Sequence, residues 1–508
     1  MIDATPLLRL YTERRAAVLA RQDAAEAQRV QLLRLVKRAA PTKFGRAHDF
    51  GSIRSVADFQ ARVPLRRYED FWRDWWKDAF PILTDITWPG RIPFFAATSG
   101  TTTGNTKYIP VSRAMNKSNR RAALDLLAHH LTARPQSRIF GGRNFMLGGS
   151  TNLSQQAPGI RSGDLSGIAA QTVPRWARPR FFPPLRYALM DDWEKKIEAL
   201  ARLSLDANIV NLGGTPSWVL LLFERLAALQ PDRPKRVASW YPDLELYTHG
   251  GVAFDSYRPR FKDLFKGSHA ELREVYPASE GFVAVADRGE GEGMRLLADN
   301  GLFFEFVPVE EIDAPNPTRH WVDTIETGVN YAIILSTCAG LWSYVIGDTV
   351  RFVDRAPLRL LVTGRLTYML SAFGEHLIGA ELEAGISTAA QAVQRTVRDW
   401  TVTARMPEAI SSGRGGHLYI VEFDSATDDD EDALVRFAKA LDADLIARNL
   451  DYAAHRSGGF GMDTPVVRAA PPGTFAAWMK SRGMLGGQNK VPRVIRDAAL
   501  FQSLERML

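Results

Sequence analysis

The sequence predicts an α/β protein with a large N-terminal α/β domain and a smaller C-terminal α+β domain. Three observations support this prediction. A chain of 508 residues that is 45% hydrophobic and 24% charged has an ordinary globular composition, but it is too long for a single core. From about residue 90, short apolar runs alternate with helical patterns, as is typical of α/β folds. The pattern changes near residue 363, so we expect domains at residues 1–363 and 364–508.

The expected elements follow in chain order. Residues 1–60 carry apolar residues at helical spacing, with Pro41 and Gly45 breaking the helices, and the first helix is expected to pack on the body of the protein through an amphipathic face. A cluster of tryptophans on one helical face is expected in the core: Trp72, Trp75 and Trp76. The expected strands are 91–98, 207–212, 301–309, 331–338, 341–353 and 416–426. The expected helices are 112–131, 216–229 and 431–456.

Charge and cysteine content narrow the class of protein. The 64 Lys and Arg residues are spread among 57 acidic residues without a dense basic block, so nucleic acid is not an expected partner, whereas anionic substrates are compatible. The single cysteine, Cys338, lies in an apolar run and is expected to be buried. No run reaches the roughly 18 apolar residues of a membrane span, and the first residues lack the apolar block of a signal peptide. We therefore expect a cytoplasmic protein, monomeric or weakly dimeric, with no membrane partner.

A strand followed by a loop of hydroxyls and glycines carries the strongest chemical signal. The loop residues are Thr98, Ser99, Gly100, Thr101, Thr102, Thr103, Gly104, Asn105, Thr106 and Lys107. Glycines let a backbone approach a polyphosphate, N–H and hydroxyl groups donate to its oxygens, and a lysine supplies positive charge. The spacing differs from that of a Walker A loop. The run predicts a phosphate-binding loop, and the alternative is a flexible Ser/Thr turn.

Two weaker motifs follow in the chain. Tyr276-Pro277-Ala278-Ser279-Glu280 offers an aromatic ring that can stack on a purine and a carboxylate that can hold the Mg²⁺ of ATP. Asp348 ends an apolar run, and its carboxylate could accept hydrogen bonds from both ribose hydroxyls. Taken alone, each motif is more simply an ordinary turn.

In this order, the three motifs resemble the phosphate loop, the Tyr/Glu motif and the ribose aspartate of the acyl-adenylate-forming superfamily. The chain is more closely similar to the acyl-acid amido synthetases of plants, the Gretchen Hagen family, and to their bacterial relatives. Further segments carry this likeness: residues 240–244, 248–251, 336–342, 370–375, 472–475 and 488–493. The resemblance implies a luciferase-like architecture, ATP and Mg²⁺ as cofactors, and transfer of an activated carboxylic acid to an amine, with an amino acid as the expected amine.

The resemblance also assigns roles to individual residues. It places Thr98, Ser99, Gly100, Thr101, Thr102 and Lys107 around the phosphates. It places Tyr276, Ser279 and Glu280 at adenine, the acyl phosphate and Mg²⁺, Asp348 at ribose, and Arg365 near the hinge between domains. Lys490 matches a lysine of the smaller domain that meets the acid and phosphate, which makes Lys490, Glu280 and Lys107 the expected catalytic residues. The plant segment T-G-S-M is here His249-Gly250-Gly251-Val252, where Gly250 is expected to border the nucleotide, so a plant substrate does not carry over.

Two other functions remain compatible with the sequence. A ligase could share the first step and use coenzyme A as acceptor. A protein that senses ATP or AMP without turnover could carry the same motifs, although Lys107, Glu280, Asp348 and Lys490 together argue against this. The sequence contains no H-E-x-x-H, C-x-x-C or G-x-S-x-G motif, which argues against zinc hydrolysis and serine esterase chemistry.

Overall fold

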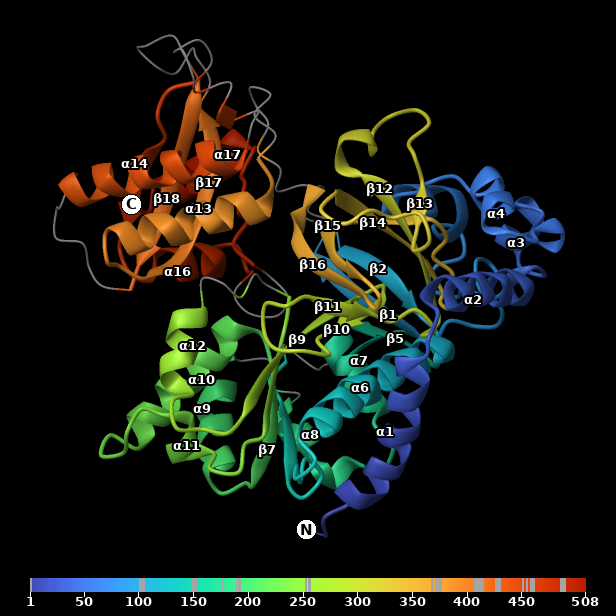
Figure 1. Cartoon of the computed structure of the whole chain (residues 1–508), viewed down its shortest axis with the longest axis horizontal. Helices are drawn as coiled ribbons and strands as arrows, with labels where there is room; N and C mark the ends of the chain where they lie inside the picture. Colours follow the sequence, from blue (N-terminus) through green and yellow to red (C-terminus); the bar gives the residue numbers. More distant parts are fainter. Residues whose placement is uncertain are drawn as a thin grey trace. The chain divides into compact units, whose positions relative to one another are not determined.

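The structure is a computed structural model of the chain (Figure 1). It describes residues 2–99, 106–148, 153–175, 177–188, 190, 193–251, 254, 257–366, 370, 377–405, 415–424, 431–449, 452–453, 456, 462–484 and 490–508. The chain divides into two compact units. The N-terminal unit comprises Met1–Val252, Arg260–Ile346 and Val350–Leu361, and the C-terminal unit comprises Ala253–Pro259, Gly347–Thr349 and Val362–Leu508. Two short segments from the middle of the chain therefore belong to the C-terminal unit.

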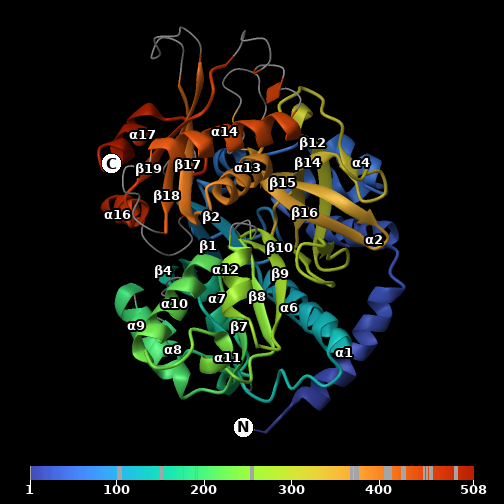
Figure 2. The same cartoon turned by 60° about the vertical axis from the view of Figure 1, so that its left-hand side comes forward.

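A sheet of twelve strands lies mostly in the N-terminal unit (Figure 2). In spatial order it contains β13 (His320–Trp321), β12 (Leu302–Pro308), β14 (Asn330–Thr337), β15 (Tyr344–Arg355), β16 (Leu358–Arg365), β11 (Met294–Leu296), β10 (Gly281–Val285), β9 (Glu271–Ala278), β8 (Leu246–His249), β7 (Ile209–Gly213), β3 (Arg143–Met146) and β6 (Phe181–Phe182). The block from β6 to β9 is parallel, whereas β9 and β10 form an antiparallel hairpin. All seven residues of β12 are buried, including Glu305, which forms an ion pair with Arg319 at 2.7 Å.

A second sheet carries the hydroxyl-rich loop. Its order is β2 (Thr106–Val111), β1 (Phe94–Ser99), β5 (Ile160–Gly163) and β4 (Ser154–Ala157). Strands β1 and β2 are antiparallel and place Thr98 opposite Lys107. The two ends of the loop are therefore side by side.

The expected elements of this unit mostly form as predicted. Helices α6 (Arg113–Ala133) and α10 (Pro216–Leu229) are present, and β1, β7, β12 and β14 match the expected strands closely. Strand β15 begins at Tyr344 rather than at residue 341, because Ser343 adopts a positive φ of 43° in the preceding turn. The Ser343 hydroxyl donates to Glu305 at 2.9 Å, which stabilises this turn in the core. Cys338 is buried, as expected.

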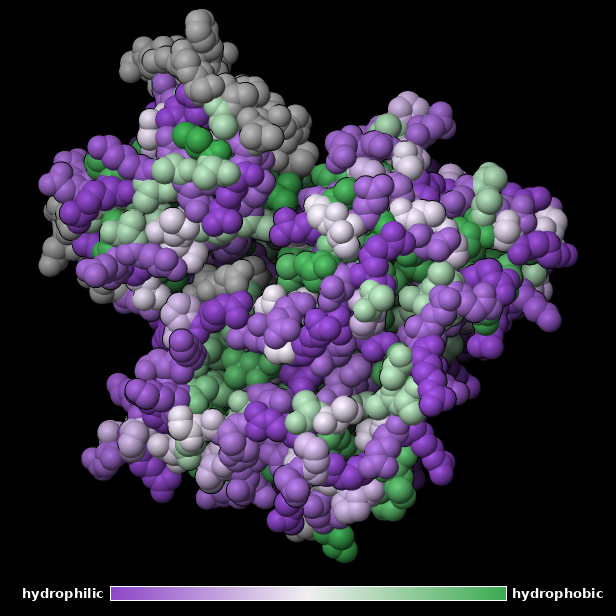
Figure 3. Space-filling model, in the orientation of Figure 1, coloured by the Kyte–Doolittle hydropathy of each residue, from purple (hydrophilic) through white to green (hydrophobic). Residues whose placement is uncertain are grey.

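The first helix packs on the body of the protein, but not through an apolar face. Helix α1 (Thr5–Ala20) lies against α6 (Figure 1) and buries Thr5, Thr12, Arg15 and Leu19. The apolar side chains of Leu7, Leu10 and Val18 point outward and are 74%, 62% and 56% exposed. Figure 3 shows hydrophobic residues among hydrophilic ones along this helix. The expectation of an apolar packing face was wrong, because a buried ion pair holds the helix instead.

The prediction that Gly45 breaks a helix was also wrong. Helices α2 (Ala24–Ala39) and α4 (Val56–Arg62) flank the short α3 (Lys43–Ala47), and Gly45 lies inside α3. A Cβ atom at Gly45 would lie 2.1 Å from the Ala39 carbonyl oxygen, so glycine is needed for the close approach of two backbones. Trp76 is buried, and Trp72 and Trp75 pack against the main core, which confirms their expected packing role.

The C-terminal unit is an α+β domain. Its sheet contains β17 (Val397–Arg405), β18 (Gly416–Phe423) and β19 (Val466–Ala470), and its helices are α13 (Gly379–Ala392), α14 (Glu431–Arg448), α16 (Thr474–Ser481) and α17 (Ala498–Glu505). Helix α14 ends at Arg448, before the expected residue 456. The Asn449 side chain accepts the Tyr452 N–H at 2.8 Å and donates to Glu381 at 3.0 Å, so it is held by partners outside α14. Among the described residues, no helix has the length and apolar character needed to cross a membrane.

A buried histidine near the end of α6 is held between carboxylates. His130 Nδ1 lies 2.8 Å from Glu271 Oε2, and its Nε2 lies 3.1 Å from Ser137 Oγ and 3.6 Å from Glu245 Oε2. Burial opposes protonation, but the two glutamates raise the pKa of His130 above its ordinary value. Burial also opposes ionisation of Glu271, yet its pKa falls to about 2 because His130 and arginine side chains surround it.

This network should make the stability of the N-terminal unit depend on pH. Because the folded pKa of His130 lies above 6.5, its stabilisation is complete below pH 6.5 and is lost as pH rises through the folded pKa. The stabilisation from Glu271 is present above pH 4.5 and is lost as pH falls toward about 2. Thermal unfolding of the wild type and His130→Gln between pH 4 and pH 9 tests this expectation. The wild type should have its largest advantage near pH 6, and an advantage that does not vary with pH would contradict it.

Candidate functional site

The carboxyl ends of parallel strands form one edge of the large sheet in the N-terminal unit. Because β3, β7, β8 and β9 run parallel, the residues that follow them meet at this edge: Leu147, Gly214, Gly250 and Ser279. Open α/β sheets bind ligands outside the carboxyl ends of their strands. A Cβ atom at Gly250 would lie 2.1 Å from the Val275 carbonyl oxygen, so only glycine fits this approach to β9. His249, directly before it, is buried at the end of β8.

Ser279 and Glu280 form the turn between β9 and β10, at the same edge. The carboxyl group of Glu280 is buried and is hydrogen-bonded to the hydroxyl of Tyr344. Burial and the negative charge of Glu280 raise the pKa of Tyr344 well above its ordinary value, so this hydroxyl stays protonated and can donate to Glu280. Tyr276 lies on β9, and its ring is buried in the main core.

Lys107 stands at the end of the hydroxyl-rich loop and is held by a short helix. Its Nζ lies 3.1 Å from Glu69 Oε1 and 5.2 Å from the centre of the Tyr68 ring, and both residues belong to α5 (Tyr68–Phe71). The Tyr68 hydroxyl also accepts the Tyr108 N–H at 2.9 Å, which ties α5 to β2. Ion pairing and the ring face fix the position of the ammonium group. Of the loop itself, Gly100, Thr101 and Thr102 lie outside the described residues, as does the side chain of Ser99.

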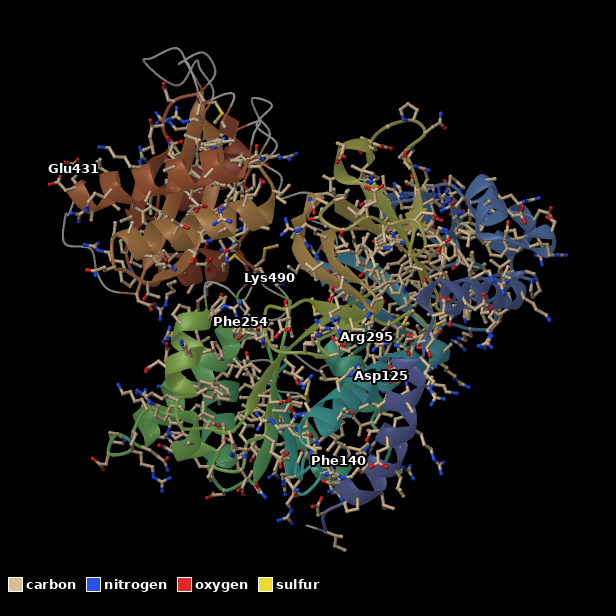
Figure 4. All side chains as sticks on the ribbon, in the orientation of Figure 1. Asp125, Phe140, Phe254, Arg295, Glu431 and Lys490 are labelled. Atoms are coloured by element: carbon tan, nitrogen blue, oxygen red, sulfur yellow. The ribbon has the colours of Figure 1, made fainter. Side chains whose placement is uncertain are left out.

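Three predicted site residues gather in the C-terminal unit. Asp348 on β15 and Arg365 at the end of β16 form an ion pair with 2.8 Å between Oδ1 and Nε. Both charges act on Lys490, which is labelled in Figure 4. Crowding by surrounding protein atoms and the Arg365 charge lower the pKa of Lys490 to about 8, and Asp348 opposes this shift. Taken as a whole residue, Lys490 is exposed.

Each unit therefore brings together its own set of predicted residues. Lys107 and Thr98 stand on paired strands of the N-terminal unit, where Tyr276, Ser279, Glu280 and Gly250 share the strand edge. Asp348, Arg365 and Lys490 share the C-terminal unit. Sequence reasoning missed Tyr68, Glu69 and the partnership of Tyr344 with Glu280. No local motif indicates these contacts, because they join segments distant in the chain.

The described side chains suit a metal held by one carboxylate. No group of three or more His, Cys, Asp or Glu residues that could hold a metal ion occurs among them. Mg²⁺ commonly uses one or two carboxylates together with the phosphates of a nucleotide rather than a cage of protein ligands. A buried carboxylate such as Glu280 fits that mode, whereas a structural metal centre does not fit the described part of the chain.

Comparison with known families decides the identity of the chain. The model described as GH3 family N-terminal domain matches residues 15–178, the GH3 family central domain matches residues 295–365, and the GH3 family C-terminal domain matches residues 380–499. The three matches together cover more than half of the chain. The chain belongs to the GH3 family.

Curated relatives are plant GH3 enzymes. The chain is 28% identical over 261 residues to the probable indole-3-acetic acid-amido synthetase GH3.9 of Oryza sativa subsp. japonica, which covers 47% of this GH3 chain and 57% of the relative. It is 28% identical over 280 residues to the indole-3-acetic acid-amido synthetase GH3.8 of Oryza sativa subsp. indica, with 52% and 45% covered. The matched region thus spans about half the length of these relatives.

Solved structures extend the similarity of fold over almost the whole chain. The GH3.15 acyl acid amido synthetase has a TM-score of 0.75 at 16% identity and covers 95% of this GH3 chain and 93% of its own. A 2-hydroxyisobutyryl-CoA ligase in complex with 2-HIB-AMP has a TM-score of 0.61 at 14% identity, with 94% and 90% covered. At these identities the likeness shows the fold alone. The mixed α/β fold therefore resembles both GH3 enzymes and acyl-CoA ligases that form adenylates.

Proposed function

We propose that this GH3 protein activates a carboxylic acid with ATP and transfers the acyl group to the amine of an amino acid to form an amide. The observation that carries the proposal is the gathering of Asp348, Arg365 and Lys490 in one unit of a GH3 chain. A carboxylate suits ribose hydroxyls, and two cations suit the charges of a phosphate and a carboxylate. In the N-terminal unit, the β1–β2 hairpin supports the proposal because it places Lys107 at the end of the predicted phosphate-binding loop.

The first half-reaction joins the acid to AMP. An oxygen of the substrate carboxylate attacks the α-phosphorus of ATP, and the bond between that phosphorus and the bridging oxygen breaks to release pyrophosphate. Lys107 and Lys490 would offset negative charge on the phosphate oxygens, and Asp348 would hold the ribose. Glu280 would hold Mg²⁺, which neutralises charge on the phosphates when it is bound.

The second half-reaction forms the amide. The nitrogen of the amine attacks the acyl carbon, the bond to the phosphate oxygen breaks, and AMP leaves with the electron pair. The nitrogen then loses a proton to solvent or to a nearby base. The similarity of fold to a 2-hydroxyisobutyryl-CoA ligase favours one alternative, in which the thiol of coenzyme A replaces the amine. AMP release measured with amino acids and with coenzyme A separates the two, because only the true acceptor accelerates it.

Removal of the Asp348 carboxylate should weaken nucleotide binding. In Asp348→Ala, AMP should bind roughly 10- to 100-fold more weakly, because a charged hydrogen bond contributes roughly 1.5–3 kcal/mol. Isothermal titration calorimetry with AMP measures this change. Asp354→Ala is a matched control, because Asp354 lies on the same strand and its side chain is 41% exposed. Equal AMP affinity in wild type and Asp348→Ala would rule out the ribose assignment.

A further inference from the structure

The segment that follows Lys490 is bound to the edge of the C-terminal sheet. We call residues 491–495 the C-terminal strap. Strand β17 is the edge strand next to β18, and the strap pairs with it in parallel. The Val402 N–H donates to the Arg493 carbonyl at 2.8 Å, and the Ile495 N–H donates to the Val402 carbonyl at 2.9 Å. The Thr401 hydroxyl adds a bond of 2.6 Å to a strap carbonyl.

The side chain of Arg493 also binds the strap to α13 and β17. Its Nε donates to Glu383 Oε1 on α13 at 2.8 Å, and its Nη1 donates to the Trp400 carbonyl at 2.9 Å and pairs with Asp399. The guanidinium also lies 4.9 Å from the centre of the Trp400 ring, and the Trp400 Nε1 donates to the other oxygen of Glu383 at 3.3 Å. Arginine is suited to such a site because its planar fork can meet several acceptors and an aromatic face at once.

These contacts leave Arg493 poorly suited to bind substrate. The side chain is 17% exposed, and its two carboxylate partners, Glu383 and Asp399, are 15% and 27% exposed. The surrounding negative charges raise the pKa of Arg493 despite burial, so the guanidinium is charged at every working pH. A phosphate or a carboxylic acid would have to displace two carboxylates that already satisfy this charge. Arg493 follows Lys490 by three positions in the chain, which limits the distance between their Cα atoms to roughly 10 Å.

We propose that Arg493 is a positioning residue, which anchors the C-terminal strap to β17 and α13 so that the Lys490 amine is held ready for adenylate formation. The proposal rests on the proposed function only for the role of Lys490. The anchoring itself concerns the chain alone. Preorganised charges accelerate reactions because they need no rearrangement in the transition state. An anchor three residues away restricts the movement of the lysine and so preorganises its charge.

The test compares Arg493→Ala, Arg493→Lys and Glu383→Gln with the wild type. Arg468→Ala is the matched control, because Arg468 forms an ion pair with Glu505 at 2.9 Å in the same unit and is 55% exposed. Circular dichroism identifies variants that fail to fold, and Arg493→Lys keeps the charge if the alanine variant unfolds. Three readouts follow: hydrogen exchange of the Val402 and Ile495 amides, labelling of Lys490 by acetic anhydride as a function of pH, and acid-dependent ATP–pyrophosphate exchange.

The first two readouts need no substrate. We expect exchange of the two amides to rise at least tenfold in Arg493→Ala and to rise in Glu383→Gln, with no change in Arg468→Ala. The charged groups that act on the Lys490 amine are Arg365, Asp348 and Arg493. Loss of the Arg493 charge should therefore raise the labelling pKa of Lys490 above the wild-type value of about 8 and slow its labelling at pH 8 severalfold. Arg493→Lys should restore the labelling pKa but not the amide protection.

The third readout connects the anchor to catalysis. In Arg493→Ala, we expect kcat of pyrophosphate exchange to fall at least tenfold while KM for ATP changes less than threefold, because the nucleotide contacts remain. An unchanged kcat with an active wild type, or unchanged amide protection, would overturn the positioning role. A large rise in KM for ATP at unchanged kcat would overturn it in favour of direct nucleotide binding. A wild type without exchange for any acid would contradict the proposed function, while amide exchange and labelling would still decide the anchoring.

Discussion

Lys490→Ala should slow formation of the acyl-adenylate about 100-fold or more, since this is the magnitude expected when one preorganised charge is removed from a polar transition state. The charges of Asp348 and Arg365 act on the lysine, and the residue is exposed. ATP binding should change little, because Asp348 and Lys107 remain. Chemically prepared acyl-AMP should still react with the amine at a near-normal rate. Single-turnover measurements of each half-reaction test this expectation.

The pH dependence of the wild type gives an independent check on Lys490. Because its pKa is lowered to about 8, the amine loses its proton and its charge as pH rises through that value, and adenylate formation should fall with it. Lys439→Ala is a matched control on the exposed face of α14 and should behave like the wild type. An equal loss in both half-reactions for Lys490→Ala would indicate general damage, and no loss in either would show that Lys490 is an ordinary surface lysine.

The second large effect concerns the buried ion pair that holds α1. Arg15→Ala should destabilise the N-terminal unit by about 3–5 kcal/mol, because it leaves a buried carboxylate without its partner. Arg15 Nη2 lies 2.7 Å from Asp125 Oδ2 and 2.8 Å from Asp299 Oδ1, and the Asp125 side chain, labelled in Figure 4, is 0% exposed. Urea unfolding followed by tryptophan fluorescence measures the loss.

Two further variants make this prediction specific. Arg14→Ala removes a neighbouring exposed arginine of α1 and should leave the unfolding midpoint unchanged. The double variant Arg15→Ala/Asp125→Ala should lose less stability than the sum of the single variants, because the uncompensated charge is gone. A midpoint for Arg15→Ala equal to that of the wild type would contradict the account of how α1 is held.

The elements that formed as predicted are those whose local sequence pattern agrees with their burial in the structure. Helix α10 spans Pro216–Leu229 as expected, because a proline in the first turn and apolar residues at helical spacing favour the same conformation. Strand β12 was found because its apolar residues, which flank Glu305 on both sides, are typical of a strand with both faces covered. In both cases the local sequence was sufficient to predict the element.

Elements that depend on distant partners were not predictable in this way. The packing face of α1 is set by Arg15, whose partner Asp125 lies 110 residues further along the chain. The support of Lys107 by Glu69, and of Glu280 by Tyr344, likewise joins segments that no motif connects. The family resemblance indicated Asp348, Arg365 and Lys490 one by one, but it did not predict that the segment with Asp348 belongs to the same compact unit as Lys490. Ion pairs between segments that are distant in the chain produce no periodic pattern in the sequence.

Acid-dependent exchange between ATP and labelled pyrophosphate tests the central claim most directly. The purified chain, incubated with Mg²⁺, ATP, labelled pyrophosphate and a panel of carboxylic acids, should incorporate label into ATP only when a suitable acid is present. The reaction needs no amine, because exchange reports reversible formation of the acyl-adenylate alone. Label incorporation with at least one acid, reduced about 100-fold in Lys490→Ala, is the predicted result. No incorporation across a broad panel, from a chain that binds AMP, would contradict adenylation and indicate a nucleotide-binding protein without turnover.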